Sequence, residues 1–265
     1  MEKITTVTLR QMKERGEKIV MLTGYDFSMT KLLNEAGVEA ILVGDSLGMV
    51  KLGYETTLPV TVDDIIYHCK AVKRGNSRSL IIADMPFMSY EAGVDEAIAN
   101  AGKVIKEGGA EAVKIEGGRE MAAKIQALVA AKIPVMGHIG LTPQSINQLG
   151  GYKVQGRSLD EARRLVDEAR VLEAAGVFAI VLECIPAAVA VEITKAVSVP
   201  TIGIGAGGGC DGQILVTDDM LGLYGEFKPK FVKRYADLRS QIVDAIRLYK
   251  KEVKEAAFPS DEHTY

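Results

Sequence analysis

The sequence is poor in cysteine, since Cys69, Cys184 and Cys210 are widely spaced and form no CxxC pair. This excludes a disulfide framework and a cysteine-based zinc site. No apolar run approaches the roughly 18 residues that cross a bilayer. The polar start MEKITTVTLRQMKERGEK lacks the apolar centre of a signal peptide. Neither sign of charge dominates, with 32 basic and 35 acidic residues, so charge gives no reason to expect nucleic acid. We expect a cytoplasmic protein that binds neither a membrane nor nucleic acid.

Apolar residues, by contrast, make up 48% of the 265 residues, which is enough for a sizeable core. Eight short apolar runs alternate with longer amphipathic segments, as in parallel strands that are covered on both faces. This order predicts an α/β fold, and eight strands in about 250 residues favour a closed (β/α)8 TIM barrel over an open doubly wound sheet. We expect one domain over residues 1–265. The predicted strands lie within 18–26, 40–46, 79–86, 111–118, 133–140, 178–186, 199–207 and 213–219.

The helical segments between the runs have recognisable starts and stops. Ser158-Leu-Asp-Glu161 is a capping box, and Gly176 marks the end of the helix that it opens. The last run is preceded by a glycine loop with no clear helix. The segment 5–15 is expected to be a short helix that caps the bottom of the barrel, and the tail 258–265 is expected to be frayed. The other predicted helices are 28–36, 62–73, 94–107, 119–131 and 231–257.

Ionisable or hydroxyl side chains stand at the ends of six consecutive apolar runs. In a barrel these ends meet at one mouth, where the chemistry takes place. Each Asp or Ser could instead serve only as the cap of the next helix, and this alternative is strongest for Asp26. Lys114 and Glu116 are two residues apart and therefore share one strand face. The candidate site residues are Asp45, Ser46, Asp84, Lys114, Glu116, His138 and Glu183.

Three of these residues, Asp45, Asp84 and Glu116, offer hard oxygen ligands of the kind that Mg²⁺ prefers. Open positions on the ion suit the keto and carboxylate oxygens of a 2-oxo acid, and a Lewis acid there acidifies the neighbouring C–H bond. Lys114 would then counter the negative charge of the substrate. Glu183, in the apolar context IVLECIP, is the candidate base.

Other readings of these residues stay open at this level. His138 is an alternative base, a hydrogen-bonding partner or a satisfied core histidine, and Ser46 is a substrate contact or a helix cap. Lys114 also suits a Schiff-base aldolase, although a nearby Glu116 would keep it charged. A metabolite-binding barrel without turnover is a further alternative. The run 203–209 contains a formal GxGxxG, but it does not open a helix early in a βαβ unit, so we reject a dinucleotide site.

Several motifs, in order along nearly the whole chain, resemble those of the 3-methyl-2-oxobutanoate hydroxymethyltransferase (ketopantoate hydroxymethyltransferase) family. They are LTGYD (22–26), VGDSLGMV (43–50), ADMPFMSY (83–90), AVKIEGG (112–118), PVMGHIGLTPQ (134–144), VLECIP (181–186) and IGIGAG with CDGQILVTDD (202–219).

This resemblance implies a TIM barrel of the phosphoenolpyruvate/pyruvate type and transfer of a one-carbon unit from 5,10-methylenetetrahydrofolate to 3-methyl-2-oxobutanoate, giving 2-dehydropantoate. It implies one Mg²⁺ per subunit at Asp45, Asp84 and Glu116. It also implies 2-oxo acid contacts at Asp45, Ser46, Asp84 and Lys114, with Glu183 as the proton acceptor. A homo-oligomer, a decamer in the family, is expected on the same ground. The folate half of the reaction rests on the resemblance alone. A carbon–carbon lyase or a phosphonomutase of the same barrel type is the principal rival.

Overall fold

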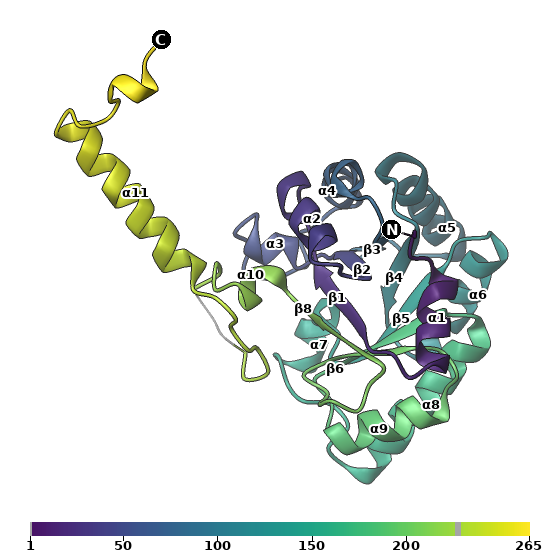
Figure 1. The fold of residues 1–265 in the computed structure, drawn as a ribbon. Coiled ribbons are helices and arrows are strands. Elements are labelled where there is room, and N and C mark those ends of the chain that lie inside the picture. Colours follow the sequence, from purple (N-terminus) through teal and green to yellow (C-terminus); the bar gives the residue numbers. More distant parts are fainter. Residues whose placement is uncertain (1, 226–228) are drawn as a thin grey trace. The chain divides into compact units, whose positions relative to one another are not determined.

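The computed structural model describes residues 2–225 and 229–265, and within them eight parallel strands close into a barrel (Figure 1). Every strand pairs with its neighbours in sequence, and β8 pairs with β1. All eight predicted strands are confirmed; β1 to β7 lie within the expected ranges, and β8 begins at Gly212, one residue before its range. The strands are β1 (Ile19–Thr23), β2 (Ala40–Val43), β3 (Leu80–Asp84), β4 (Ala112–Glu116), β5 (Val135–Gly140), β6 (Ala179–Glu183), β7 (Thr201–Ile204) and β8 (Gly212–Leu215).

Helices follow most of the strands and surround the barrel (Figure 1). The helices predicted before residue 216 are confirmed with small shifts, and the segment 94–107 ends in a π-helical turn, η1 (Val104–Gly108). The sequence analysis did not predict α9. The helices of this part are α1 (Thr6–Glu14), α2 (Phe27–Glu35), α3 (Leu47–Val50), α4 (Val62–Gly75), α5 (Val94–Lys103), η2 (Arg119–Met121), α6 (Ala122–Ala130), η3 (Pro143–Ser145), α7 (Ile146–Leu149), α8 (Leu159–Ala175) and α9 (Ala187–Ala196).

Local capping explains where the longest of these helices begins and ends. The Ser158 hydroxyl accepts from the backbone N–H of Glu161, and the Glu161 carboxylate accepts from the N–H of Ser158. Gly176 ends α8 in the left-handed conformation, which glycine adopts at little cost. The capping box read from the sequence is therefore present.

The barrel closes through β8, which follows β7 after a short glycine-rich loop with no intervening helix. Two residue pairs join β7 to β8, whereas four join β8 to β1. A Cβ atom at Gly212 would lie 2.5 Å from the carbonyl oxygen of Ile19. Only glycine therefore allows the last strand to approach the first closely enough to complete the barrel.

The helix α1 packs its apolar side against the inside of the barrel. Leu9 and Met12 are buried in one cluster with strand residues such as Ile19, Met21 and Ile202. Lys13 donates from Nζ to the carbonyl oxygens of Thr194, Val197 and Val199, and its Nζ lies 2.9 Å from Asp211 Oδ2. These contacts join the N-terminal helix to the end of α9 and to the segments before β7 and β8.

The chain divides into two compact units, Met1–Leu215 and Val216–Tyr265. The second unit contains α10 (Thr217–Met220), α11 (Leu238–Lys254) and η4 (Asp261–His263). The prediction of a helix over 231–257 is wrong at both ends. Asp237 caps α11 through Ser240 N, so the helix begins seven residues later than expected, and it stops at Lys254. One domain over 1–265 and a frayed tail stay predictions. Within the described residues, no helix is long and apolar enough to cross a membrane.

Candidate active site

The predicted site residues gather at the carboxyl ends of β2 to β6, inside one end of the barrel. Strand register places them there, because Asp84 stands opposite Lys114 and Glu116 stands opposite His138 on neighbouring strands. Asp45 follows β2, and its backbone N–H donates to Asp84 Oδ2 at 2.9 Å. Five of the residues are almost completely buried: Asp45, Asp84, Lys114, Glu116 and His138. The expectation that the strand ends form one cluster is thus met for these side chains.

Lys114 lies at the centre of the cluster. Its Nζ is 3.0 Å from Asp84 Oδ1, 3.5 Å from Glu116 Oε1 and 3.0 Å from His138 Nδ1. Burial alone would lower its pKa, but the Asp84, Glu116 and Asp45 carboxylates outweigh burial and raise it. The side chain therefore remains an ammonium, which is not a nucleophile, and this argues against a Schiff-base aldolase.

The three carboxylates share more negative charge than Lys114 can balance. Burial, followed by the charges of Asp84 and Glu116, holds the pKa of Asp45 well above its usual range. Burial also raises the pKa of Asp84, against the opposing effect of Lys114. For Glu116 the attraction of Lys114, followed by contacts with His138 and the backbone N–H of Gln144, overcomes burial and lowers the pKa. The cluster can therefore accept a cation, because further positive charge would relieve the repulsion among these groups.

His138 links the buried cluster to Glu183. Its Nε2 is 3.1 Å from Glu183 Oε2, and its Nδ1 faces both Lys114 and Glu116. Burial and Lys114 lower the pKa of His138, but Glu116 and Glu183 together raise it to about 9. The 3.0 Å contact with Lys114 Nζ requires a lone pair on Nδ1, however, since two cationic donors repel at that distance. In this arrangement the ring is therefore neutral, and its proton on Nε2 faces Glu183.

Glu183 is the most accessible of the acidic candidates, because its side chain keeps 15% of its surface exposed, against 3% for Asp84. It ends β6, one strand away from His138. The Nε2 atom of His138 lies near its carboxylate but makes no aligned hydrogen bond to any group in the described chain. A carboxylate at the rim of a buried polar cluster is well placed to exchange a proton with a bound molecule.

A metal ion would have to be held by the three carboxylates. In the parts of the chain that the structure describes, no three His, Cys, Asp or Glu side chains are already gathered to hold one. The donors nevertheless fit a hard divalent cation in two respects. Asp84 Oδ1 is buried and has no aligned hydrogen bond among the described groups, although Lys114 Nζ lies nearby. The remaining donors are carboxylate oxygens in a cluster with excess negative charge.

Asp26 and Ser46, which follow β1 and β2, differ in whether they cap the next helix. Asp26 caps α2, and its side chain accepts from the backbone N–H of Met29 at 2.8 Å, as expected for a helix cap. Ser46 makes no capping hydrogen bond with its side chain, and its Oγ lies 2.8 Å from the hydroxyl of Tyr25. The Ser46 hydroxyl is thus held beside the cluster by an aromatic side chain and remains a candidate substrate contact.

Gln144 and Tyr90 belong to the same cluster, and neither was predicted from the sequence as a site residue. The Gln144 amide donates to Asp45 Oδ2 at 2.8 Å, and its backbone N–H donates to Glu116 Oε2 at 3.0 Å. Tyr90 OH donates to Gln144 Oε1 at 2.7 Å. Both residues lie in segments after a strand end, where periodicity gives no signal. They are the last residues of two motifs that carry the family resemblance, PVMGHIGLTPQ (134–144) and ADMPFMSY (83–90).

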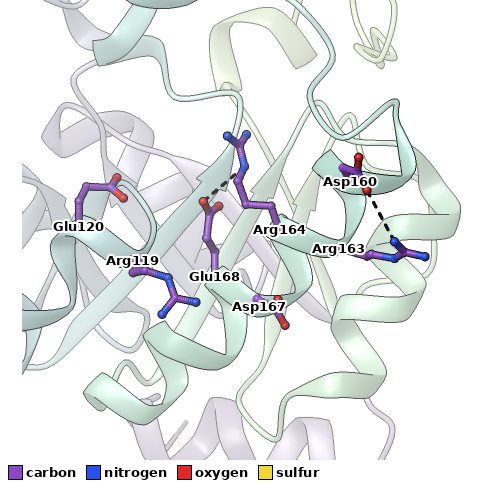
Figure 2. A pocket seen from close by; sticks show the side chains of 7 residues that line it. All are labelled: Arg119, Glu120, Asp160, Arg163, Arg164, Asp167 and Glu168. Atoms are coloured by element: carbon purple, nitrogen blue, oxygen red, sulfur yellow. Dashed lines mark ion pairs between the residues drawn. The ribbon is translucent and has the colours of Figure 1, made fainter.

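A hollow lies outside the barrel, between η2 and α8 (Figure 2). Its charged side chains largely pair with one another, as in the contacts of Arg164 with Glu168 and of Arg163 with Asp160, both at 3.6 Å. The hollow contains none of the predicted site residues, so we do not assign the chemistry to it. It is lined by Arg119, Glu120, Asp160, Arg163, Arg164, Asp167 and Glu168.

Solved structures with the same fold include enzymes with different activities. A phosphonopyruvate hydrolase, crystallised with oxalate and Mg²⁺, matches with a TM-score of 0.64 and 15% identity, over 99% of this chain and 93% of that one. A 2,3-dimethylmalate lyase, a member of the PEP mutase/isocitrate lyase superfamily, matches with a TM-score of 0.59 and 16% identity, over 98% and 91%. These likenesses confirm the predicted (β/α)8 barrel fold.

Curated relatives are much closer in sequence. The 3-methyl-2-oxobutanoate hydroxymethyltransferase of Carboxydothermus hydrogenoformans is 58% identical over 265 residues, covering 100% of this chain and 96% of that protein. The enzyme of the same name from Syntrophus aciditrophicus is 55% identical over 263 residues, covering 99% and 97%. The family model described as ketopantoate hydroxymethyltransferase matches residues 3–261. On this evidence, and with the barrel and its polar cluster in place, the chain is an enzyme that belongs to the ketopantoate hydroxymethyltransferase family.

Proposed function

We propose that the protein transfers a hydroxymethyl group from 5,10-methylenetetrahydrofolate to 3-methyl-2-oxobutanoate and so forms 2-dehydropantoate, in the pathway to pantothenate. The observation that carries the proposal is the buried cluster of three carboxylates around Lys114, with Glu183 at its rim. The names of the relatives support the acceptor and the transferred group. The folate donor and a homo-oligomer, a decamer in the family, rest on the resemblance of the motifs. The cytoplasmic location stays the expectation drawn from the composition of the chain and its polar start.

The residues of the chain that bind the 2-oxo acid would be Lys114, Ser46, Asp45 and Asp84. The Lys114 ammonium supplies a fixed positive charge for the substrate carboxylate in a site from which water is largely excluded. Because this charge is already held by Asp84 and Glu116, it is oriented before the substrate arrives.

One Mg²⁺ per subunit would be held by Asp45, Asp84 and Glu116, whose donor chemistry fits it. When bound, the ion would supply Lewis-acid polarisation of the substrate keto oxygen, which favours loss of the neighbouring proton. The three carboxylates have a second role in the absence of substrate, since they keep Lys114 charged.

Proton removal is assigned to Glu183. Its carboxylate takes the proton from C3 of 3-methyl-2-oxobutanoate, and the electron pair of the C–H bond moves into the enolate. His138, whose Nε2 lies 3.1 Å from Glu183 Oε2, is assigned as an auxiliary in returning the proton. The enolate carbon then bonds to the methylene carbon of the folate as the first of its two C–N bonds breaks. Water supplies the hydroxyl oxygen as the second C–N bond breaks, and the two folate nitrogens take up the proton held by Glu183 and the proton released by the water.

The proposal is tested by following deuterium exchange at C3 for a panel of 2-oxo acids, with and without Mg²⁺. We expect exchange of 3-methyl-2-oxobutanoate that requires the divalent metal, and formation of 2-dehydropantoate once methylenetetrahydrofolate is added. If purified protein with Mg²⁺ exchanges no C3 proton, the proposal is wrong. If it exchanges the proton but forms no product with the folate, the donor is wrong and the enolate chemistry stands.

A further inference from the structure

Gln144 is a buried amide in the turn η3 that has all of its hydrogen-bonding groups engaged. Its Nε2 donates to Asp45 Oδ2 at 2.8 Å and to the carbonyl oxygen of Met85 at 3.0 Å, while Oε1 accepts from the Tyr90 hydroxyl at 2.7 Å. The residue is 6% exposed, so water cannot replace these partners easily. A buried amide satisfied in this way has one orientation.

The contacts themselves identify which end of the amide faces the carboxylate. If the amide were turned over, its oxygen would face two acceptors, Asp45 Oδ2 and the Met85 carbonyl. Tyr90 also reinforces the observed orientation, because its hydroxyl donates to Oε1 and lies 3.3 Å from the carbonyl oxygen of Glu116. The Tyr90 hydroxyl is buried along with the amide.

Gln144 also joins two of the candidate metal ligands. Its side chain holds one oxygen of Asp45, which follows β2, and its backbone N–H holds one oxygen of Glu116, at the end of β4. Each carboxylate has a second oxygen that these bonds leave for other partners. Because the two groups repel each other, donors placed between them fix where each carboxylate can lie.

We propose that Gln144 is a positioning residue of the site, which orients the Asp45 and Glu116 carboxylates for a divalent cation, with Tyr90 holding its amide in place. This inference rests on the proposed function for the role of the cation. It assigns no contact between Gln144 and the substrate. The effect of Gln144 is transmitted through the carboxylates.

The test compares Gln144→Met, which keeps the length of the side chain but removes the amide, with Tyr90→Phe, which removes only the hydroxyl. Gln148→Met is the matched control, since Gln148 is exposed in the adjoining helix α7. Three quantities are measured for each full-length variant: the Mg²⁺ dissociation constant by calorimetry without substrate, the melting temperature, and kcat and KM for C3 proton exchange.

We expect Gln144→Met to weaken Mg²⁺ binding at least ten-fold and to lower kcat at least ten-fold, with a smaller change in KM. Tyr90→Phe should weaken Mg²⁺ binding three- to ten-fold, and the control should match the wild type within two-fold. A lower melting temperature with unchanged Mg²⁺ affinity in both variants would mean a purely structural role and would overturn the inference. Should Gln144→Met fail to fold, Tyr90→Phe decides on its own.

The failure of the inference can be told apart from that of the proposed function. A wild-type protein that binds Mg²⁺ but exchanges no C3 proton refutes the proposed function, while the Mg²⁺ affinities of the variants still decide the role of Gln144. A wild-type protein with no measurable Mg²⁺ affinity overturns the inference directly.

Discussion

The assignment of Glu183 as the base leads to the most direct prediction, for the substitution Glu183→Gln. The amide has nearly the same size and keeps an oxygen that can face His138 Nε2, which lies 3.1 Å from Glu183 Oε2. It cannot take up a proton at neutral pH. The change therefore removes the basic group while leaving the shape of the site intact.

The expected size of the effect follows from the position of Glu183. A positioned base contributes about 10²- to 10⁴-fold to the rate of proton transfer. At 1.36 kcal/mol for each factor of ten, this is about 3 to 5 kcal/mol of activation free energy. Folding should hardly change, because the side chain is partly exposed and its contact with His138 is not an aligned hydrogen bond. A loss of stability below about 1 kcal/mol is expected.

The assay is the rate of deuterium incorporation at C3 of 3-methyl-2-oxobutanoate with saturating Mg²⁺, measured beside a melting curve. Glu192→Gln is the matched control, because it is the same chemical change at a residue that is exposed on α9. Exchange at the wild-type rate in Glu183→Gln would refute Glu183 as the base and would move the assignment to His138. Equal losses in both variants would show that the effect is not specific to the site.

Three further predictions test other parts of the structure. Asp84→Asn should abolish the Mg²⁺-dependent rise in melting temperature, which for the wild type at 100 times the dissociation constant corresponds to about 2.7 kcal/mol; an undiminished rise would exclude Asp84 as a ligand. Gly140→Ala should destabilise the fold by about 3 kcal/mol or more in urea unfolding, because the φ of Gly140 is +97° and a Cβ atom there would lie 2.2 Å from the carbonyl oxygen of Glu183. Gly16→Ala is its control. The φ of Gly16 is +69° and the space around it is open, so this change should lower the free energy of unfolding by only about 1 kcal/mol. Lys13→Met should cost about 3 kcal/mol in the same measurement, since it leaves Asp211 and three carbonyl oxygens without their ammonium partner; a loss below about 1 kcal/mol would contradict this account of how α1 is attached.

Much of the fold was readable from local pattern. Strands β1 to β7 lie within the predicted apolar runs, and β8 begins one residue before its run, because buried parallel strands need both faces apolar and this requirement appears in a few consecutive residues. The helix α9 was missed because its short segment after Pro186 lacks a polar cap. The start of α11 was missed because Asp237, and not the apolar stripe, decides where the helix begins.

The candidate site, too, could be predicted only in part from the sequence. The rule that parallel strands in a barrel deliver their carboxyl ends to one mouth was sufficient to bring Asp84, Lys114 and Glu116 together. The sequence could not say that Lys114 touches His138 as well, because that contact depends on the register between β4 and β5 and on the positions of both side chains.

The amino-acid sequence alone therefore determined the barrel, its order of strands and the chemical types present at its mouth. These features follow from periodicity, turn signals and residue type, which act over a few neighbouring positions. Only the tertiary structure decided that Gln144 bonds to Asp45, 99 positions away along the chain, and that Tyr90 sets the orientation of its amide. Such contacts form when the barrel closes and excludes water, because buried polar groups must then find partners wherever the fold has placed them.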